Sequence, residues 1–335
     1  MTIKDIAKLC NTSVATVSRV INNDPKVADA TRQKVLEVIK EQKFVPNITG
    51  RNLRTQKSMK ILVLLPTMAN QFYARILQGI DEKAEEFGYD MLVAVTNQDE
   101  AQESKYLDML RMKTVDGCIS FFNTLSANKI TSLARDYPFV QCCEPTLYAN
   151  VSSVVVNNRQ AIYETCLEFI KEGHKRIAMI SGDYYKYSEQ CRENGYKEAL
   201  IENGIEVDDT LIIKNFYRYK DGSDATKTLM NLENPPTAII CASDSLALGA
   251  ISELKNFGKV VGEDVKVIGF DNTSITEYFC PTISSIAQPR FDLGQEAFKL
   301  LLEKLEDNTS SYKQITLPHR IVHRESTKPR LKVFN

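Results

Sequence analysis

The sequence lacks the residue patterns on which most enzymes and metal proteins depend. It has only three histidines, and none lies in a motif with a serine or cysteine nucleophile. G-x-S-x-G, Walker A and G-x-G-x-x-G motifs are also missing. Eight cysteines are present, but none forms a C-x-x-C pair, and the only close pair is Cys142-Cys143. We therefore expect reduced thiols, no catalytic activity, no cofactor and no metal site.

Long apolar runs are missing as well. No stretch of about 18 apolar residues exists, so we expect no membrane span. The N-terminal stretch MTIKDIAKLC carries charges every few residues and has no apolar core, so it is no secretory signal. The C-terminal stretch STKPRLKVFN has no leucine heptads, which argues against a tetramerising coiled coil. A cytosolic protein is the expectation.

Charge is distributed unevenly along the chain although the net charge is only −1. Residues 1–60 hold 12 Lys or Arg and 5 Asp or Glu, a net of +7. The rest holds 30 against 38, a net of −8. A basic N-terminal segment on an acidic body suggests that this end binds a polyanion, although a solvated basic surface would look the same.

The first 45 residues carry three helix signals. Thr2 and Asp5 have the spacing of a capping box, and Ser13 is a natural N-cap for a second helix. A third helix is expected from about Asp29 to near Lys43. The gap between the first two helices is about three residues, which is the length of a helix-turn-helix connection.

The second expected helix, in the stretch SVATVSRVINN, has two distinct faces. Its inward face holds Val17, Val20 and Ile21, and its outward face is small and polar with a single cation. Short hydroxyl side chains can approach phosphates, and one Arg can donate two hydrogen bonds to guanine. These features favour a helix that lies in the DNA major groove over a generic three-helix packing unit. The outward residues are Ala15, Thr16, Ser18, Arg19 and Asn22.

From Lys60 onward, short apolar runs alternate with helical patterns. KILVLLP, DMLVAVTN, VDGCISFF, RIAMISG, TAIICAS and VKVIGFD are each typical of a buried strand. Strands that alternate with helices predict parallel α/β sheets. About 275 residues is long for one doubly wound sheet, so two similar lobes fit better.

These blocks together resemble a known family. TIKDIAKLC-NTS-VATVSRVIN, VIGFDNT and LPHRIVHRESTK, with several blocks between them, are similar to the LacI/GalR family of bacterial transcription regulators in family order. The resemblance spans about residues 2–327. It implies an N-terminal helix-turn-helix domain (1–45), a hinge helix (46–58) and a two-lobed domain like periplasmic binding proteins (59–335). The N-lobe would comprise about 59–156 and 289–317, and the C-lobe about 157–288 and 318–330.

The resemblance also implies which residues contact DNA. Val14, Ala15 and Arg19 match base-contacting positions, and Thr16, Ser18 and Asn22 match positions that mostly hold phosphates. In the hinge, Leu53 matches a leucine that wedges into the minor groove and kinks the duplex, and Arg51 lies beside it. The family more often has alanine and serine on either side of this arginine, whereas this chain has Gly50 and Asn52. Here Gly50 lowers helix propensity by about 1 kcal/mol, so we expect a hinge that depends more on DNA and dimer contacts.

For the two-lobed body, the resemblance implies a small-molecule effector held between the lobes. An arginine, carboxylates and aromatic faces are the groups that polyhydroxylated ligands need. A structural salt bridge is the alternative for Arg192 and Asp271, and Asp244, next to Ser243, is a structural candidate too. The implied effector residues are Phe72, Tyr73, Glu144, Ser188, Arg192, Tyr217, Ser243 and Asp271.

The sequence therefore predicts a homodimeric repressor that binds a near-palindromic operator and responds to an effector, by default a sugar. A nucleoside or purine effector remains open. A sugar-binding protein without a DNA role would suit the body but not the basic N-terminal unit. An α/β enzyme would need catalytic groups that we do not find.

Overall fold

In the computed structural model of the protein, the structure is described for residues 1–21, 24–44, 57–182 and 186–328. The chain divides into two compact units, Met1–Ser58 and Met59–Asn335. Asn22, Arg51 and Leu53, three of the expected DNA-binding positions, lie outside the described residues. No helix within the described ranges is both long and apolar enough to cross a bilayer.

The first unit is a three-helix domain. Its helices are α1 (Ile3–Leu9), α2 (Val14–Ile21) and α3 (Asp29–Glu41). At the end of α1, Asn11 adopts a left-handed conformation with φ of 48°. The amide of Thr12 then donates to the carbonyl of Ala7 and that of Asn11 to Lys8, the hydrogen-bond pattern of a Schellman motif. This sharp stop confirms the short connection expected between the two helices.

Side chains cap two of these helices as expected. The amide of Thr2 donates to the Asp5 carboxylate at 2.8 Å, and the amide of Thr16 donates to Oγ of Ser13 at 3.0 Å. Both bonds satisfy backbone groups at helix starts that would otherwise lack partners. The three helices then pack on a small core of Ile6, Ala7, Cys10, Val17, Val20, Val27 and Val35.

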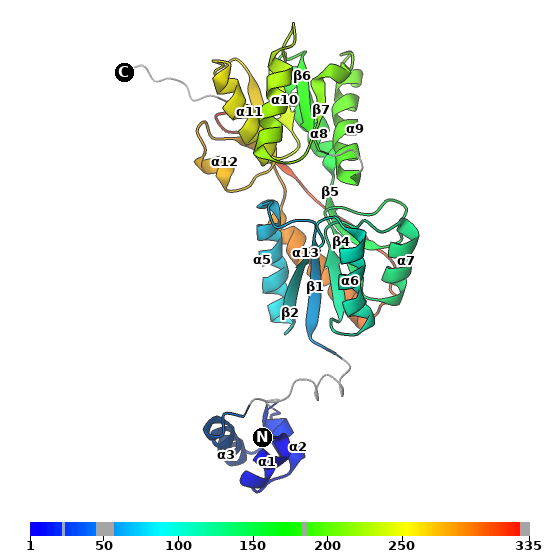
Figure 1. Ribbon diagram of the computed structural model, residues 1–335, viewed down its shortest axis with the longest axis vertical. Coiled ribbons are helices and arrows are strands. Elements are labelled where there is room, and N and C mark those ends of the chain that lie inside the picture. Colours follow the sequence, from blue (N-terminus) through cyan, green and yellow to red (C-terminus); the bar gives the residue numbers. More distant parts are fainter. Residues whose placement is uncertain (22–23, 45–56, 183–185, 329–335) are drawn as a thin grey trace, which may run out of the picture. The chain divides into compact units, whose positions relative to one another are not determined.

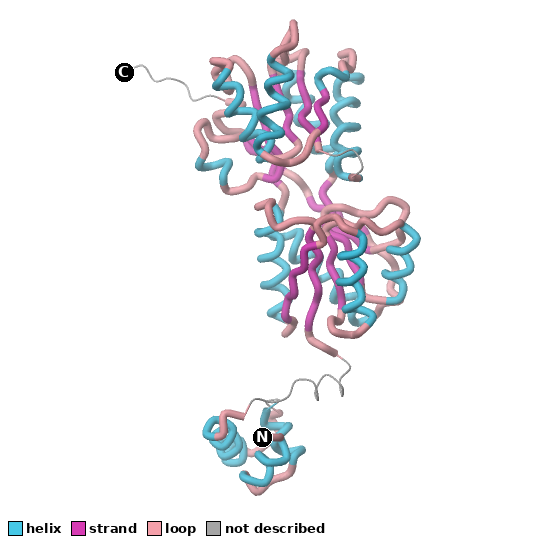
Figure 2. Tube along the Cα trace, viewed as in Figure 1, coloured by secondary structure: helices cyan, strands magenta, loops and turns pink. Residues whose placement is uncertain are grey.

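The second unit contains two α/β lobes, each built around its own sheet (Figures 1 and 2). In the described residues, the sheet of the N-lobe has the strand order β11-β5-β4-β3-β1-β2, and all its pairings are parallel. Its strands are β1 (Lys60–Leu65), β2 (Asp90–Val95), β3 (Gly117–Ser120), β4 (Phe139–Cys142), β5 (Ser152–Val156) and β11 (Gln314–Leu317). Its helices are α5 (Phe72–Glu86), α6 (Glu100–Arg111), α7 (Ala127–Asp136) and α13 (Arg290–Glu306).

The sheet of the C-lobe has the order β12-β10-β9-β8-β6-β7 in the described residues. Its strands are β6 (Ile177–Ser181), β7 (Ile212–Lys214), β8 (Ala238–Cys241), β9 (Lys266–Asp271), β10 (Ser284–Ala287) and β12 (Arg320–Val322). All pairings are parallel except β10 with β12, which is antiparallel. The expected parallel sheets are therefore confirmed, apart from this edge strand. Around them lie α8 (Asn158–Lys171), α9 (Tyr187–Glu202), η1 (Asp209–Leu211), α10 (Tyr219–Met230), α11 (Asp244–Asn256) and α12 (Ile275–Tyr278).

The chain crosses between the two sheets at three places in the described residues. It crosses after β5 into α8, after β10 into α13, and after β11 into β12. Each connection is only one to two residues long, residues 157, 288–289 and 318–319. The two lobes are therefore joined by three short segments. We refer to the region where side chains of the two lobes meet as the cleft.

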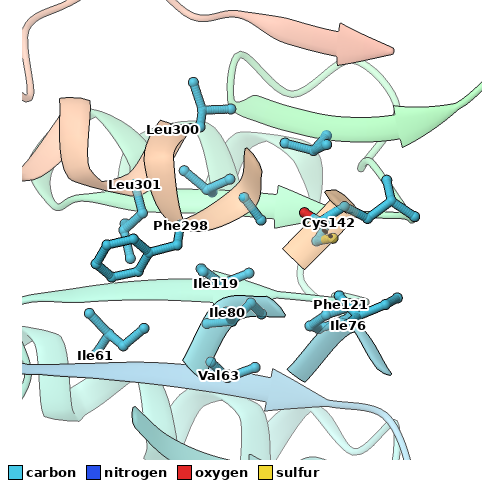
Figure 3. Packing of buried hydrophobic residues seen from close by; sticks show 14 of the residues in the cluster. Ile61, Val63, Ile76, Ile80, Ile119, Phe121, Cys142, Phe298, Leu300 and Leu301 are labelled. Carbon is cyan, nitrogen blue, oxygen red and sulfur yellow. Dashed lines mark hydrogen bonds between the residues drawn. The ribbon is translucent and has the colours of Figure 1, made fainter. Parts of the chain in front are cut away.

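Apolar side chains fill the space between sheet and helices in each lobe. In the N-lobe, Ile61 and Val63 of β1 pack with Ile76 and Ile80 of α5 (Figure 3). Fully buried strands of this kind read as continuous apolar runs, which is why KILVLLP was recognisable in the sequence. Cys142, at the end of β4, belongs to the same cluster.

Glycines let three helix pairs pack with their backbones in close contact. A Cβ at Gly79 of α5 would lie 2.1 Å from the carbonyl oxygen of Phe291 in α13, and one at Gly294 would lie 2.1 Å from that of Ile76. Gly195 of α9 fits against α8 in the same way. Gly222 and Gly249 join α10 and α11. No larger residue fits at these crossings without moving a helix.

We predict that Gly79→Ala lowers the free energy of unfolding of the second unit by about 1–3 kcal/mol, the usual cost of overpacking. The added methyl group would push against a backbone carbonyl that cannot rotate away, and this outweighs the gain in helix propensity. Urea unfolding measures the change. Asp81→Ala, an exposed position on the same helix, should stay within about 0.5 kcal/mol of the wild type. Equal stability of the two variants would contradict the close packing.

Candidate DNA-binding surface and effector cleft

One face of α2 is presented to solvent while the other forms the core of the first unit. Val17 and Val20 are buried, whereas Val14 is 40% exposed and Ala15 is exposed. The side chain of Arg19 is 62% exposed. Thr16 and Ser18 lie half-buried at the edges of this face. The described candidate DNA-binding residues, Val14, Ala15, Thr16, Ser18 and Arg19, thus share the outer surface of one helix.

Arg19 has a weak partner on this surface. Its Nε lies 4.0 Å from a carboxylate oxygen of Asp24, and both side chains are accessible. The backbone carbonyl of Asp24 accepts a hydrogen bond from Arg32 at 2.6 Å, which fixes the loop that follows α2. Exposed ion pairs contribute about 0–1 kcal/mol. Arg19 can therefore exchange Asp24 for a guanine or a phosphate at little cost.

In the second unit, Glu144 and Ser188 face each other across the cleft. Glu144 follows β4 of the N-lobe, and Ser188 lies in the first turn of α9 in the C-lobe. The Glu144 carboxylate accepts hydrogen bonds from the Ser188 amide at 3.0 Å and from its hydroxyl at 2.5 Å. Burial raises the pKa of Glu144 although these bonds oppose the shift. The two predicted residues are therefore brought together, as partners of each other.

Lys186 adds a second link across the cleft. Its ammonium lies 5.4 Å from the ring centre of Phe122 in the N-lobe and 5.2 Å from that of Tyr217 in the C-lobe. Both distances lie in the range of cation–π contacts. Tyr217, a predicted site residue, therefore lines the cleft wall.

Arg192 forms the centre of a buried network. Its Nη1 donates to Glu189 at 2.7 Å and to the carbonyl of Ala242 at 2.9 Å, and its Nε donates to Asn158 at 2.9 Å. The guanidinium also stacks on Phe270, 3.9 Å from the ring centre. Arg192 is 7% exposed and Glu189 is 0% exposed. The structural salt bridge that the sequence left open is therefore present, at the position where the resemblance implies a ligand contact.

Glu189 has further partners on its other oxygen and on the cleft side. It accepts from the amide of Gly182 at 2.8 Å and from the hydroxyl of Ser181 at 3.2 Å. The phenol of Tyr217 donates to it as well. Both oxygens of the Glu189 carboxylate thus have hydrogen-bond partners, and the carboxylate forms a buried ion pair with Arg192 that compensates the charge of the guanidinium.

Asp271 ends β9 in a strained conformation, with φ of 104° for a residue that has a side chain. Its carboxylate accepts a hydrogen bond from Nε2 of Gln288 at 2.7 Å and is 6% exposed. Burial, together with the negative charge of Asp244, raises the pKa of Asp271 to about 8. Near neutral pH the raised pKa favours the protonated carboxyl, which can donate a hydrogen bond.

The side chains of Asp244 and Ser243 make hydrogen bonds within the C-lobe. The Asp244 carboxylate accepts from the amide and hydroxyl of Thr273 at 2.6 and 2.7 Å and from the hydroxyl of Ser285 at 2.6 Å. Ser243 is the N-cap of α11, and its hydroxyl accepts from the amide of Leu246 at 3.2 Å. Both residues are buried. Asp244 thus fixes the loop that follows Asp271, and Ser243 fixes the start of α11.

The two predicted aromatic residues occupy different places. Phe72 is 8% exposed and packs into the N-lobe core. Tyr73 is half-buried and meets Phe121 edge to face, with ring centres 5.4 Å apart. Burial and the nearby charges of Asp271 and Glu144 raise the pKa of Tyr73. Tyr73, and not Phe72, is therefore the aromatic side chain that borders the cleft.

Each of the two units matches the model of a known protein family. A family model for the periplasmic binding proteins and the sugar-binding domain of the LacI family matches residues 58–325, and a model for bacterial regulatory proteins of the LacI family matches residues 2–47. The chain belongs to the LacI family. It is thus a DNA-binding transcriptional regulator with an effector-binding domain.

Individual LacI-family relatives align over nearly the whole chain. Catabolite control protein A of Priestia megaterium is 34% identical over 98% of this chain and 99% of its own length. The transcriptional repressor CytR of Escherichia coli (strain K12) is 35% identical over 91% and 90%. A solved complex of the regulator CelR with cellobiose is 28% identical, covers 97% and 99%, and has a TM-score of 0.74. These relatives are named as regulators and not as enzymes, which confirms the expectation that the chain is no enzyme.

Sequence reasoning missed Glu189, Gln288 and Lys186 in this LacI-family cleft. Glu189 lies three residues before Arg192 on one helix face, so an i, i+3 pairing would have indicated it. Gln288 follows β10, next to β9, and the carboxyl ends of parallel strands lie at one edge of a sheet. Lys186 has no comparable signal. Among the described residues there is no group of three side chains that could hold a metal ion.

We predict that Asp271 makes stability depend on pH. Because burial raises its pKa from 3.8 to about 8, its contribution is fully present below about pH 4 and is lost as the pH rises through about 8. In Asp271→Asn this dependence is absent, while Asp244, Arg192 and Arg290 remain around the site. Urea unfolding across this pH range should show the wild type losing stability relative to the variant. Parallel curves for the two proteins would rule out a raised pKa.

Proposed function

We propose that this protein is a cytosolic, homodimeric repressor in which each first unit binds one half of a two-fold symmetric operator. The observation that carries the proposal is the outer face of α2, where small polar groups surround Arg19 above a core of Val17 and Val20. Small side chains allow a helix to approach the major groove, and a lone Arg suits guanine. Val14 and Ala15 would make apolar contacts, with Thr16, Ser18 and Asn22 near phosphates.

The proposed hinge spans residues 46–58, with Leu53 as the minor-groove wedge and Arg51 beside it. The domain limits proposed are 1–45 for DNA binding and 59–335 for the effector domain and the dimer contacts. A nonspecific DNA-binding role would need the basic charge of residues 1–60 but not the outward position of Arg19.

The effector is proposed to bind between the lobes, where Glu144, Ser188, Tyr217 and Asp271 line opposite walls. A bound effector would compete with the hydrogen bonds that Glu144 and Ser188 make to each other between the lobes. Effector binding would therefore change how the lobes close. A ligand shifts such an equilibrium by its differential affinity for the two arrangements. Operator affinity would then follow effector occupancy.

The charges of the cleft favour an uncharged effector. Each cation near the cleft has an acidic neighbour: Glu189 neutralises Arg192, Lys186 acts on Glu144, and Arg290 acts with Asp271 and Asp244. Phosphates and carboxylates need an excess of positive charge and donors, which this cleft does not offer. A neutral sugar or glycoside is therefore our proposal, with a nucleoside as the second candidate. The related regulator CelR was solved with cellobiose, a neutral disaccharide.

For DNA binding, we predict that Arg19→Ala relaxes the preference at one base position per half-site by about 1–3 kcal/mol. Arg19→Lys should relax it to a similar extent, because an ammonium cannot make the two-pronged contact with guanine. Selection from a randomised duplex library measures the preference. Arg111→Ala, on the surface of the second unit, is the control and should match the wild type.

Salt titration separates specific from nonspecific loss. The slope of log K against log salt should be about −0.9 per phosphate neutralised, and should stay unchanged in Arg19→Lys. A wild-type protein that binds no duplex at low salt would contradict the DNA-binding proposal. If both Arg19 variants select the same bases as the wild type, the assignment of Arg19 as a base-contacting residue is wrong, while the DNA-binding proposal itself stands.

For the effector, we predict stabilisation by neutral sugars, polyols or nucleosides in a thermal-shift panel. A ligand at 100 times its Kd adds about 2.7 kcal/mol of stability. The phosphorylated form of a stabilising compound should have no effect, and Asp271→Asn should shift the response while Asp81→Ala leaves it unchanged. Stabilisation by phosphorylated compounds alone would refute the uncharged class.

A further inference from the structure

Two thiols lie side by side where the N-lobe borders the cleft. Cys142 is the last residue of β4, and Cys143 follows it. Their sulfur atoms are 3.6 Å apart. Cys142 is fully buried in the N-lobe cluster (Figure 3), with its sulfur 3.9 Å from the carbonyl of Leu293. Cys143 is half-buried. The described DNA-binding surface and the proposed effector contacts do not use either thiol.

The backbone holds the two sulfurs together. Cys143 has φ of 70°, and the amide of Glu144 donates to the carbonyl of Cys142 at 2.9 Å, which closes a γ-turn at Cys143. The Cys143 amide donates to the carbonyl of Val154 at 2.8 Å and so ties the turn to β5. Adjacent residues of an extended strand point to opposite faces. The turn reverses this, and it also directs Glu144 toward Ser188.

The separation of the sulfurs suits a bridging atom. A disulfide bond of about 2.05 Å would require the sulfurs to approach by about 1.5 Å. A bridging atom with bonds of about 2.3 Å, the length of a Zn–S bond and close to that of an As–S bond, spans them at an angle of about 100°. Trivalent arsenic is pyramidal with angles near this value.

The number of ligands distinguishes arsenic from zinc. Structural zinc takes four protein ligands and catalytic zinc takes three. The described residues offer no group of three candidate ligands anywhere. An organic derivative of trivalent arsenic already carries its third substituent and needs only two sulfurs. The pair therefore matches the valence of arsenic and not the coordination number of zinc.

We propose that Cys142 and Cys143 form a dithiol site that captures trivalent organoarsenicals at the edge of the effector cleft. With phenylarsine oxide, two As–S bonds form and the As–O double bond breaks. The two thiol protons leave with the oxygen as one molecule of water. Arsenic remains trivalent, so the step needs neither an oxidant nor a reductant.

Thiols that stay protonated favour the capture of arsenic over oxidation to a disulfide. The hydrogen bond with Cys142, together with burial, raises the pKa of the Cys143 thiol well above its usual value. Thiol–disulfide exchange requires a thiolate, so exchange with small disulfides is slow here. Capture of arsenic delivers the protons to the departing oxygen and does not depend on prior ionisation.

Occupation of the site would act on the cleft through Glu144. This residue is adjacent to Cys143, and its two hydrogen bonds to Ser188 connect the lobes. A phenylarsenic group on Cys143 would lie near Tyr73, because both side chains pack against the same N-lobe cluster. The capture of arsenic does not rest on the proposed regulatory function. A missing adduct would contradict the dithiol site alone, and a missing thermal shift would contradict the effector proposal alone.

The test uses the reduced, full-length protein, phenylarsine oxide and an excess of glutathione, with intact-mass spectrometry as the readout. The expected product carries one phenylarsenic group in place of two hydrogens, on the proteolytic peptide that contains both cysteines. Addition of 2,3-dimercaptopropanol should release it, because only a second dithiol can compete. Cys143→Ser should weaken binding by about 100-fold or more, the lower end of the gain from linking two contacts.

Two controls keep the outcome unambiguous. Cys191→Ser removes another half-buried thiol and should retain the adduct. Cys142→Ser changes the core, so the circular dichroism of this variant is compared with that of the wild type. If Cys142→Ser unfolds, the result for Cys143→Ser alone decides the test. No adduct on the folded wild type would overturn the proposal. An adduct that survives in Cys143→Ser would overturn it as well.

Discussion

The buried ion pair between Arg192 and Glu189 is the interaction on which the cleft depends. Through this pair and its hydrogen bonds, α9 is tied to α8 at Asn158 and to the end of β8 at Ala242, while the guanidinium covers Phe270 of β9. Removing one partner of such a pair leaves a buried charge and costs about 3–5 kcal/mol. The phenol of Tyr217 donates to Glu189 as well, so this side chain is held by the same network. The walls of the cleft are thus positioned before any ligand arrives.

The remaining polar groups of the cleft follow from that arrangement. Burial raises the pKa of the carboxyl groups of Glu144 and Asp271, and this effect outweighs the opposing charge of Arg192, which already forms an ion pair with Glu189. Each finds a neutral donor, Ser188 for Glu144 and Gln288 for Asp271. Neutral hydroxyl groups of a ligand can replace such donors without a change in net charge. The same electrostatics that stabilise the cleft would therefore also select its ligands.

Much of this organisation was visible in the sequence. Ser13 marked the start of α2, and continuous apolar runs marked the central strands, because local hydrogen bonds and full burial leave simple patterns. Arg192 and Asp271 were identified by resemblance, yet the pairing of Arg192 with Glu189 was not, since it depends on how α9 meets three other elements. Phe72 was expected in the cleft but is core, because only the packing of α5 decides which of two adjacent aromatics faces inward. The edge strand β12 runs antiparallel to β10. The composition of so short a strand does not show in which direction it runs.

The glycine crossings of the helices have a mechanical consequence. Helices whose backbones touch, as α5 touches α13 and α10 touches α11, cannot slide past one another without a steric clash. Each lobe therefore moves as a stiff block, and small displacements are not absorbed inside it. Deformation is left to the three crossovers, each only one to two residues long. Because these segments hold so few rotatable bonds, we expect any change in the relative position of the lobes to be a bending about them.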